Sequence, residues 1–449
     1  MNTTRAPGAV LLATGIVLLE FAAAITSFVT TTLLPIVAAD LRAYHQLALL
    51  IIGATLGLFV ALPLASRVIH RLGIRPTLAV GVGSYLSGAL VAATAQSPWI
   101  FAAGQLAEGF ASGLLAVFGI STAIKHLDTA LRIRVIAMSS AMWIAPALVG
   151  PSATLALEHL VGWRCALLAP VPIVVIGRLL IVRATARQAL DRDRQEHPLR
   201  RTMLIPAGVF LLVIGTTGGA WLTGTVGIAG FAMAMVGLVA ILPAGTARLR
   251  RGAPAGLAAM FLFGAGYSGA ASLITVLLTD GYRATAGQAA IMLGAAPFAW
   301  GLTSLLTGRV GKGKTRWTGP AAGLAATAAG TGVLTMAMLP SAFGVALVAW
   351  TAAGAGIGFA YPRLYILSTT PDASLSATEL ATAVVTAETL GGLFGRSVGG
   401  AIIGFDATHG GAGSGGLLIT YGLFALLLVA ATLAATRAPN PGANARVPG

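Results

Sequence analysis

The sequence predicts an all-α membrane protein with fourteen transmembrane helices. Of its 449 residues, 57% are hydrophobic and only 9% are charged, whereas a soluble domain carries about 25% charged residues. Three long stretches contain no charged residue, and they cover residues 76–107, 202–247 and 317–362. A soluble core cannot bury this much apolar surface, but helices that satisfy their own backbone hydrogen bonds in a bilayer can.

The glycine content fits the same fold class. The chain has 58 glycines, and in water each glycine inside a helix costs about 1 kcal/mol relative to alanine. In a membrane, small residues let helix backbones approach closely, and packing holds the helices together. The composition therefore predicts a tightly packed helical bundle.

The number of helices follows from length. As single helices, the charge-free stretches 202–247 and 317–362 would each be about 70 Å long, against a hydrocarbon core of about 30 Å. Each must therefore be a hairpin of two spans. The same rule, applied in order along the chain, predicts spans at 9–37, 46–66, 76–95, 98–122, 135–157, 163–182, 203–221, 224–246, 254–279, 286–307, 317–338, 342–366, 380–405 and 414–436.

The first and last spans set the orientation. The first apolar segment, 9–37, is much longer than the roughly 7–15 residues of a signal-peptide core, so we interpret it as a retained span. With the N-terminus in the cytoplasm, the 28 Lys and Arg residues fall in cytoplasmic segments or at their edges, except Arg42, Arg164, Arg283 and Arg396. This asymmetry is the positive-inside pattern, and an even span count places the C-terminus in the cytoplasm as well.

Composition also excludes several function classes. The net charge of +15 does not indicate a nucleic-acid partner, because the basic residues lie in short loops with no basic-aromatic face. The single cysteine, Cys165, rules out an internal disulfide and a multi-cysteine metal site. The sequence has no phosphate-binding loop, zinc-binding helix or nucleophile elbow, so we expect no metal, no cofactor and no enzyme activity.

Four local patterns together resemble the major facilitator superfamily, specifically its fourteen-span drug:proton antiporter branch. Gly150-Pro151 in the fifth span is similar to the core of the antiporter motif, and Gly162-Trp163-Arg164 follows it. The loop at 71–75, which contains Gly73 and Arg75, resembles the basic half of the family's loop signature. The glycine-rich stretch 390–400 resembles that of the branch. The resemblance implies a conformational role for Gly73, Arg75, Gly150 and Pro151.

The resemblance also implies an organisation and a function. It implies a six-helix bundle at 1–182, a cytoplasmic linker at 183–202, two inserted helices at 203–251 and a second six-helix bundle at 252–449. Residues 308–312 weakly resemble the same loop signature, and they occupy the position at which the second bundle would repeat it. The implied function is proton-coupled efflux of small amphipathic or cationic organic compounds by alternating access. The protein is expected to be a monomer in the cytoplasmic membrane of the cell.

Three departures from the branch leave other functions open. His70 aligns with an expected acidic residue, Gln105 with an expected arginine and Thr26 with an expected aspartate. A metabolite or siderophore exporter of the same fold is one alternative. A membrane sensor or assembly partner that does not transport is another.

The candidate functional residues are the ionisable groups inside spans. A charge at the bilayer centre costs at least about 2.5–3.5 kcal/mol, so such groups need a partner, a water-filled cavity or a function. Glu20, Glu108 and Glu388 are the candidates for proton or cation coupling. Arg396 is a candidate for holding an anionic substrate or neutralising a carboxyl. A purely structural pairing is the alternative for each.

Helical spacing extends these sites. Ser27 and Thr31 lie within about 20° of Glu20 on one face, so this stripe is expected to face a central cavity. Gln105 and Ser112 flank Glu108, and the resemblance suggests that Glu20 and Glu108 face each other. The candidate substrate-contacting residues are Ser27, Thr31, Gln105, Ser112 and Arg396.

The thirteenth span has its own pattern. Glu388 and Arg396 are about 12 Å apart along the axis and roughly 80° apart around it, so they are not expected to form a salt bridge. Glu388 shares a face with Gly392, Gly395 and Gly399, which predicts a close approach by a neighbouring backbone. Trp143, Trp300 and Trp350 also lie deep in spans, where they could line the cavity or simply pack.

Overall fold

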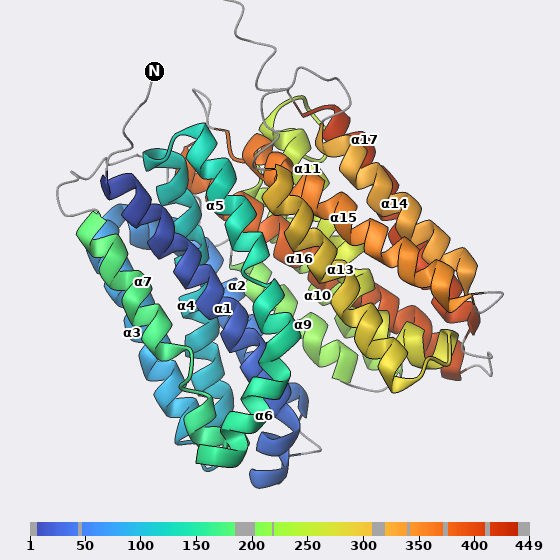
Figure 1. Ribbon diagram of the computed structural model, residues 1–449, viewed down its shortest axis with the longest axis horizontal. Helices are drawn as coiled ribbons and strands as arrows, with labels where there is room; N and C mark the ends of the chain where they lie inside the picture. The colour runs from blue at the N-terminus through green and yellow to red at the C-terminus, as the bar shows by residue number, and fades with distance from the viewer. Residues whose placement is uncertain are drawn as a thin grey trace, which may run out of the picture. The chain divides into compact units, whose positions relative to one another are not determined.

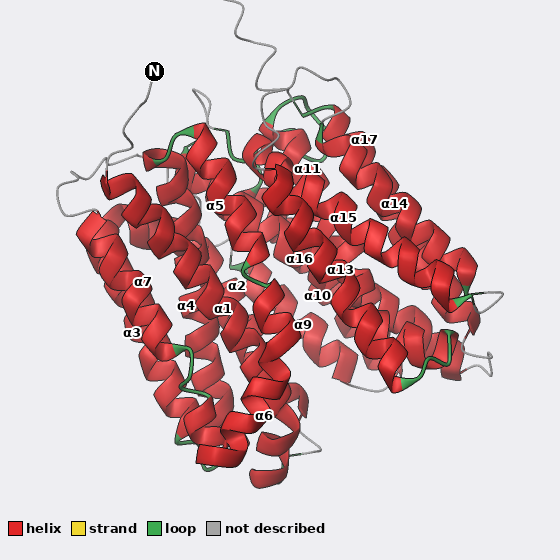
Figure 2. Ribbon diagram, viewed as in Figure 1, coloured by secondary structure: helices red, strands yellow, loops and turns green. Residues whose placement is uncertain are grey.

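The protein is helical throughout the part of the chain that its computed structural model describes (Figure 2). The described residues are 7–43, 47–184, 203–217, 220–307, 319–338, 342–370, 376–408 and 414–438. Most of the predicted linker at 183–202 and the residues 308–312 that weakly resemble the loop signature lie outside these ranges. The described helices belong to two compact units, which are considered separately below.

The first unit comprises Met1–Val135, Met142–Ile241 and Pro371–Thr382. The predicted inserted pair at 203–251 is grouped with it as far as Ile241, and the first of these two helices packs against the second helix of the chain. The helices of this unit are α1 (Pro7–Asp40), α2 (Leu47–Leu72), α3 (Ile74–Ala93), α4 (Pro98–His126), the first part of α5 (Thr129–Ala141), α6 (Ile144–Ala166), α7 (Val171–Ala184), α9 (Leu204–Thr217), α10 (Ala220–Ile241) and the start of α16 (Ala377–Thr408).

The second unit comprises Ile136–Ala141, Leu242–Thr370 and Ala383–Gly449. It holds the remainder of α5 and most of α16. Its other helices are α11 (Ala253–Phe263), η2 (Gly264–Ser268), α12 (Gly269–Val276), η3 (Leu277–Gly281), α13 (Ala286–Thr307), α14 (Pro320–Ala337), α15 (Phe343–Ser368) and α17 (Ser414–Thr436).

Each of the fourteen predicted ranges contains helix. The fifth range holds part of α5 and most of α6, and the ninth holds the unbroken run from α11 to η3. Among the described residues, ten helical stretches are long and apolar enough to cross a membrane. The helices α7 and α9 have 14 residues each, which is about 21 Å and shorter than the hydrocarbon core. The multi-pass helical fold is thus confirmed, while the count of fourteen spans stays a prediction.

Glycines bring the helices of the first unit into close contact. In Figure 1 the α1, α3, α4 and α7 ribbons lie side by side, and α1 packs along α7 while α3 packs along α4. At the crossing of α3 and α4, a methyl group added to Gly88 would lie 2.7 Å from the carbonyl oxygen of Gly104, and one added to Gly104 would meet Gly88 in the same way. Only glycine permits this approach, as the composition predicted.

The second unit contains the close approach predicted for α16. Methyl groups added to Gly391 and Gly395 would collide with the carbonyl oxygens of Phe261 and Ala265. One added to Gly399 would lie 2.7 Å from the side chain of Leu273. Of the predicted face, Gly395 packs directly on the backbone of η2, whereas Gly392 and Gly399 meet side chains, so the expected close backbone approach is confirmed at Gly395.

Two π-helical turns interrupt the long helix that contains Tyr267. They are η2, Gly264–Ser268, and η3, Leu277–Gly281. A π turn adds a residue to the helical repeat and is frequently found at functional sites. Here η2 places Tyr267, which is 3% exposed, against the side chains of α13 and α15.

Candidate functional site

The first polar centre lies on α4. Glu108 is 6% exposed and Gln105 is 2% exposed. The two residues are three positions apart, so their side chains meet on one face of the helix. The Nε2 of Gln105 donates a hydrogen bond to Oε2 of Glu108 over 3.1 Å. The predicted proximity of these two candidate residues is therefore present, and the described residues give the Glu108 carboxyl no ion pair.

Two further side chains extend this centre across three helices. Thr26 of α1 donates its hydroxyl proton to the carbonyl oxygen of Ala22 over 2.8 Å. Its Oγ1 also lies 2.8 Å from the hydroxyl of Tyr85 on α3. Because the Thr26 proton is already donated to Ala22, Tyr85 is the donor in the second bond. Tyr85, 6% exposed, lies within electrostatic reach of Glu108.

The arrangement of these four residues clarifies the departures from the antiporter branch. The branch's aspartate aligns with Thr26, and the structure joins Thr26 to Tyr85 of α3. Gln105, which aligns with the branch's arginine, is bound to the Glu108 carboxyl. At the two aligned positions the chain therefore has an amide bound to Glu108 and a hydroxyl bound to Tyr85.

Glu20 is the other acidic candidate of the first unit. It is partly exposed on α1, and within the described residues its carboxyl has no hydrogen-bond partner. No described bond connects it to Glu108, so the facing of these two carboxyls stays a prediction. Ser27 and Thr31 are both exposed, and the Thr31 hydroxyl donates to the carbonyl oxygen of Ser27 over 2.7 Å. Ser112 is half-buried on α4.

The residues of the predicted conformational motifs lie at helix breaks and helix contacts. Gly73 separates α2 from α3 with a φ of 82°, a left-handed backbone that favours glycine, and Arg75 is exposed at the start of α3. Gly150 lies on α6 against α1, where an added methyl group would be 3.2 Å from Cβ of Phe28. Pro151 is inside α6 and exposed.

The second polar centre lies in the second unit. The hydroxyl of Tyr361 on α15 contacts both carboxyl oxygens of Glu388 on α16, at 3.1 Å and 3.0 Å. Both residues are half-buried. Arg396 is exposed two turns further along α16, and no described ion pair joins it to Glu388, which agrees with the expectation from their helical spacing.

Aromatic rings surround the second centre. The Trp300 ring of α13 lies 5.6 Å from Tyr361, 5.7 Å from Tyr267 and 6.3 Å from Phe263, measured between ring centroids. Trp350 stacks on Tyr267 at 5.3 Å. Trp300 and Trp350 both pack within this ring cluster, and a cavity-lining role for either stays a prediction.

Sequence reasoning missed the tyrosines of both centres, Tyr85, Tyr267 and Tyr361. A signal was nevertheless present. The chain has only seven tyrosines, and in membrane proteins tyrosine is usually found at the two interfaces. Tyr85 and Tyr267 are near the middle of predicted spans and Tyr361 is five residues inside the end of one, and a hydroxyl within a span needs a polar partner.

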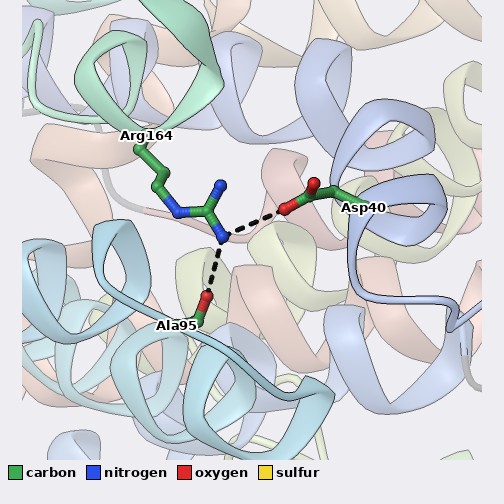
Figure 3. Close-up of polar contacts among 3 residues, drawn as sticks. All are labelled: Asp40, Ala95 and Arg164. Carbon is green, nitrogen blue, oxygen red and sulfur yellow. Dashed lines mark hydrogen bonds and ion pairs between the residues drawn. The ribbon is translucent and has the colours of Figure 1, made fainter.

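A third polar cluster lies at one end of the first unit (Figure 3). Nη2 of Arg164 is 3.0 Å from Oδ2 of Asp40 and donates to the carbonyl oxygen of Ala95 over 3.2 Å. The guanidinium also lies 4.2 Å from the centroid of the Trp163 ring. One side chain thus connects the C-terminal ends of α1, α3 and α6. These ends share one side of the unit, as the predicted alternation of span directions requires.

A multi-pass helical protein with acidic and amide side chains buried inside its spans has the features of a membrane transporter. A family model described as "Major Facilitator Superfamily" matches residues 16–395. The chain therefore belongs to the Major Facilitator Superfamily and is a multi-pass transporter of the cytoplasmic membrane.

Solved structures of low sequence identity share the fold. The human organic anion transporter MFSD10 is 14% identical with a TM-score of 0.67, and the alignment covers 96% of this chain and 100% of that one. The Escherichia coli fucose:proton symporter FucP is 16% identical with a TM-score of 0.65, over 95% and 98% of the two chains.

Curated relatives match a smaller part of the chain. The "Probable multidrug-efflux transporter Rv1634" of Mycobacterium tuberculosis is 32% identical over 143 residues, which are 32% of this chain and 30% of that protein. The triacylglyceride transporter of Mycolicibacterium smegmatis is 26% identical over 198 residues, covering 43% and 35% respectively. The chain therefore spans only about a third of the length of the curated relatives that it matches.

Proposed function

We propose that this transporter exports small amphipathic or cationic organic compounds in exchange for protons, by alternating access to a site near the middle of the membrane. The observation that carries the proposal is Glu108. It is a carboxyl, 6% exposed, that receives a hydrogen bond from a neutral amide and has no cationic partner among the described residues.

The chemistry of Glu108 suits exchange of a proton for a cationic substrate. A carboxylate buried away from water requires neutralisation, because an unpaired buried charge is costly. A proton can supply it, and so can a cationic substrate. Since the two compete for one carboxyl, binding of one displaces the other, which couples inward proton flow to outward substrate movement. The likeness to a multidrug-efflux transporter over a third of the chain supports the same substrate class.

The organisation that we propose is the fourteen-span form, with both termini in the cytoplasm and a monomeric chain. Helix in each of the fourteen predicted ranges supports the count. The distribution of Lys and Arg supports the orientation.

A second candidate function is export of a neutral lipid. The similarity to a triacylglyceride transporter over 43% of this chain favours it. Such a substrate cannot neutralise a carboxylate, so its transport would not require competition at Glu108.

The test is transport driven by a pH gradient in proteoliposomes, using cationic, neutral and anionic dyes. Glu108→Gln keeps the side-chain size and removes the proton-binding group, and we expect it to abolish gradient-driven export of cationic dyes. Glu20→Gln tests the second predicted coupling carboxyl in the same way. Glu158→Gln is the matched control, because Glu158 is a half-buried carboxyl of α6 outside the polar centre, and it should transport like the wild type.

Two results would count against the proposal. Gradient-driven export of cationic dyes by Glu108→Gln at the wild-type rate would remove Glu108 from the coupling. Export of a neutral lipid that is unaffected by Glu108→Gln, together with no movement of any dye, would favour the second candidate.

A further inference from the structure

Arg132 is a buried cation at the junction between α4 and α5 in the first unit. It lies in the first turn of α5 and is 7% exposed. Val135, three residues further along the same helix, is 4% exposed and belongs to the apolar core formed by α1, α3, α4 and α7. A positive charge in such surroundings destabilises the protein unless an anion lies against it.

The part of the chain that the structure describes supplies no such anion. The Arg132 guanidinium has no hydrogen bond and no ion pair with a described residue, and its Nε is buried and unbonded. Asp128 is four residues earlier, the spacing at which a carboxylate and an arginine usually pair on a helix. Its Oδ1 instead accepts the backbone N–H of Leu131 over 2.6 Å. The acidic side chain nearest in sequence therefore caps α5 and leaves Arg132 uncompensated.

The outer edge of the guanidinium is where an anion can reach Arg132. Nη1 and Nη2 have no described partner either, but unlike Nε they are not fully buried. Arginine spreads its positive charge over all three nitrogens, so an anion at the two outer ones neutralises the whole group. The same two nitrogens present parallel N–H bonds, which match two oxygens of a phosphate or carboxylate.

The local charge and the location favour a phosphate group. Lys125 and Arg134 are exposed on either side of Arg132 in the sequence. Asp128 is the only acidic residue from 109 to 157. An excess of positive charge of this kind attracts anions. The orientation proposed above places the junction at the cytoplasmic leaflet, where lipids are anionic and basic pockets between helices bind their head groups.

We propose that Arg132 is a binding site for a phosphate group, supplied by an anionic lipid headgroup or by free phosphate. Nη1 and Nη2 donate to two phosphate oxygens, and Lys125 and Arg134 strengthen the attraction from a distance. The site lies at the end of two helices of the first unit, and it is separate from the buried carboxyl assigned to coupling. Only the choice of leaflet rests on the proposed function.

The test uses purified full-length protein in micelles of an uncharged detergent, without a pH gradient. Native mass spectrometry measures the dissociation constants of phosphatidylglycerol and phosphatidylcholine that carry the same acyl chains. A second arm compares the thermal unfolding midpoint in inorganic phosphate and in chloride at equal ionic strength. The variant is Arg132→Met, which removes the charge and keeps a long side chain. The matched control is Arg134→Met, because Arg134 is exposed two residues away on α5.

Each source of phosphate gives its own result. If a lipid occupies the site, the wild type should bind phosphatidylglycerol about tenfold more tightly than phosphatidylcholine, and Arg132→Met should lose that preference. If free phosphate occupies it, phosphate should raise the unfolding midpoint of the wild type and leave that of Arg132→Met unchanged. Arg134→Met should keep the response of the wild type, with dissociation constants within about threefold.

Stability without any anion is the measurement that separates binding from structure. Arg132→Met should then unfold at the same temperature as the wild type or higher, because it removes a buried charge that has no partner. A clearly lower midpoint would show that the guanidinium is bonded within the protein, and the proposal would be wrong. It would also be wrong if the wild type showed neither a preference for phosphatidylglycerol nor a response to phosphate. None of these results depends on transport, so failure of the proposed function would leave the site standing.

Discussion

The Arg164 cluster at one end of the first unit yields a prediction about how its helix ends are held together. Arg164 makes three contacts, with the Asp40 carboxylate, the Ala95 carbonyl oxygen and the Trp163 ring. Asp40 shares only the first of them. Removing Arg164 should therefore cost more stability than removing Asp40, although both belong to the same ion pair.

The expected loss of stability for each variant follows from how exposed the two side chains are. The side chains of Arg164 and Asp40 are 44% and 45% exposed, and exposed ion pairs contribute about 0.2–1 kcal/mol. The hydrogen bond to Ala95 adds about 0.5–1.5 kcal/mol, and the cation–π contact with Trp163 adds about 0.5–1 kcal/mol. Arg164→Ala should thus lower the free energy of unfolding by about 1.2–3.5 kcal/mol, and Asp40→Ala by about 0.2–1 kcal/mol.

The assay is a double-mutant cycle on the free energy of unfolding in detergent micelles. The interaction energy between Arg164→Ala and Asp40→Ala should equal the ion-pair contribution, about 0.2–1 kcal/mol. Arg42→Ala is the control, because it removes an exposed positive charge two residues from Asp40 and should stay within about 0.5 kcal/mol of the wild type. Equal costs for the two single variants, with no further loss in the double variant, would refute the reasoning.

Three other substitutions test backbone contacts by the same unfolding measurement. Gly88→Ala places a methyl group 2.7 Å from a carbonyl oxygen of α4 and should destabilise by about 1–3 kcal/mol, whereas Gly83→Ala on the same helix meets nothing within 4 Å and should not. Gly162→Ala should cost about 1–2 kcal/mol, because its φ is 78°; if Gly224→Ala, which is free of that strain, cost as much, the explanation would fail. Tyr421→Phe removes a 2.9 Å hydrogen bond to the Ala270 carbonyl in a fully buried site and should cost about 0.5–1.5 kcal/mol, so full wild-type stability would contradict it.

The helices could be predicted because hydrophobic length is a local property of the sequence. A span of about 20 apolar residues has few structural alternatives, so every predicted range contains helix, although α6 runs from the fifth range into the sixth and α7 begins at Val171. The contact between Gln105 and Glu108 was equally accessible, since residues three apart share a helix face. The glycine face of α16 was predictable for the same reason.

Contacts between helices could not be predicted in this way. The bond between Thr26 and Tyr85 joins residues 59 positions apart, and no periodicity relates them. The ring contacts of Trp300 and Trp350 with Tyr267 depend on the π turn η2, which contains Tyr267. A π turn leaves no recognisable mark on hydropathy, so the sequence placed Tyr267 in a span without indicating which neighbours its ring meets.

The π turn η2 also bears on how this part of the chain tolerates changes in length. An α-helix turns by 100° per residue, so one extra residue would normally rotate everything that follows it to a different face. A π turn absorbs that residue locally, and the helix beyond it keeps its original orientation. A homologue one residue shorter between Phe263 and Gly269 would then have an unbroken α-helix with the same side of α12 turned toward α17. Single-residue insertions and deletions should therefore be found at this point more readily than elsewhere in the span.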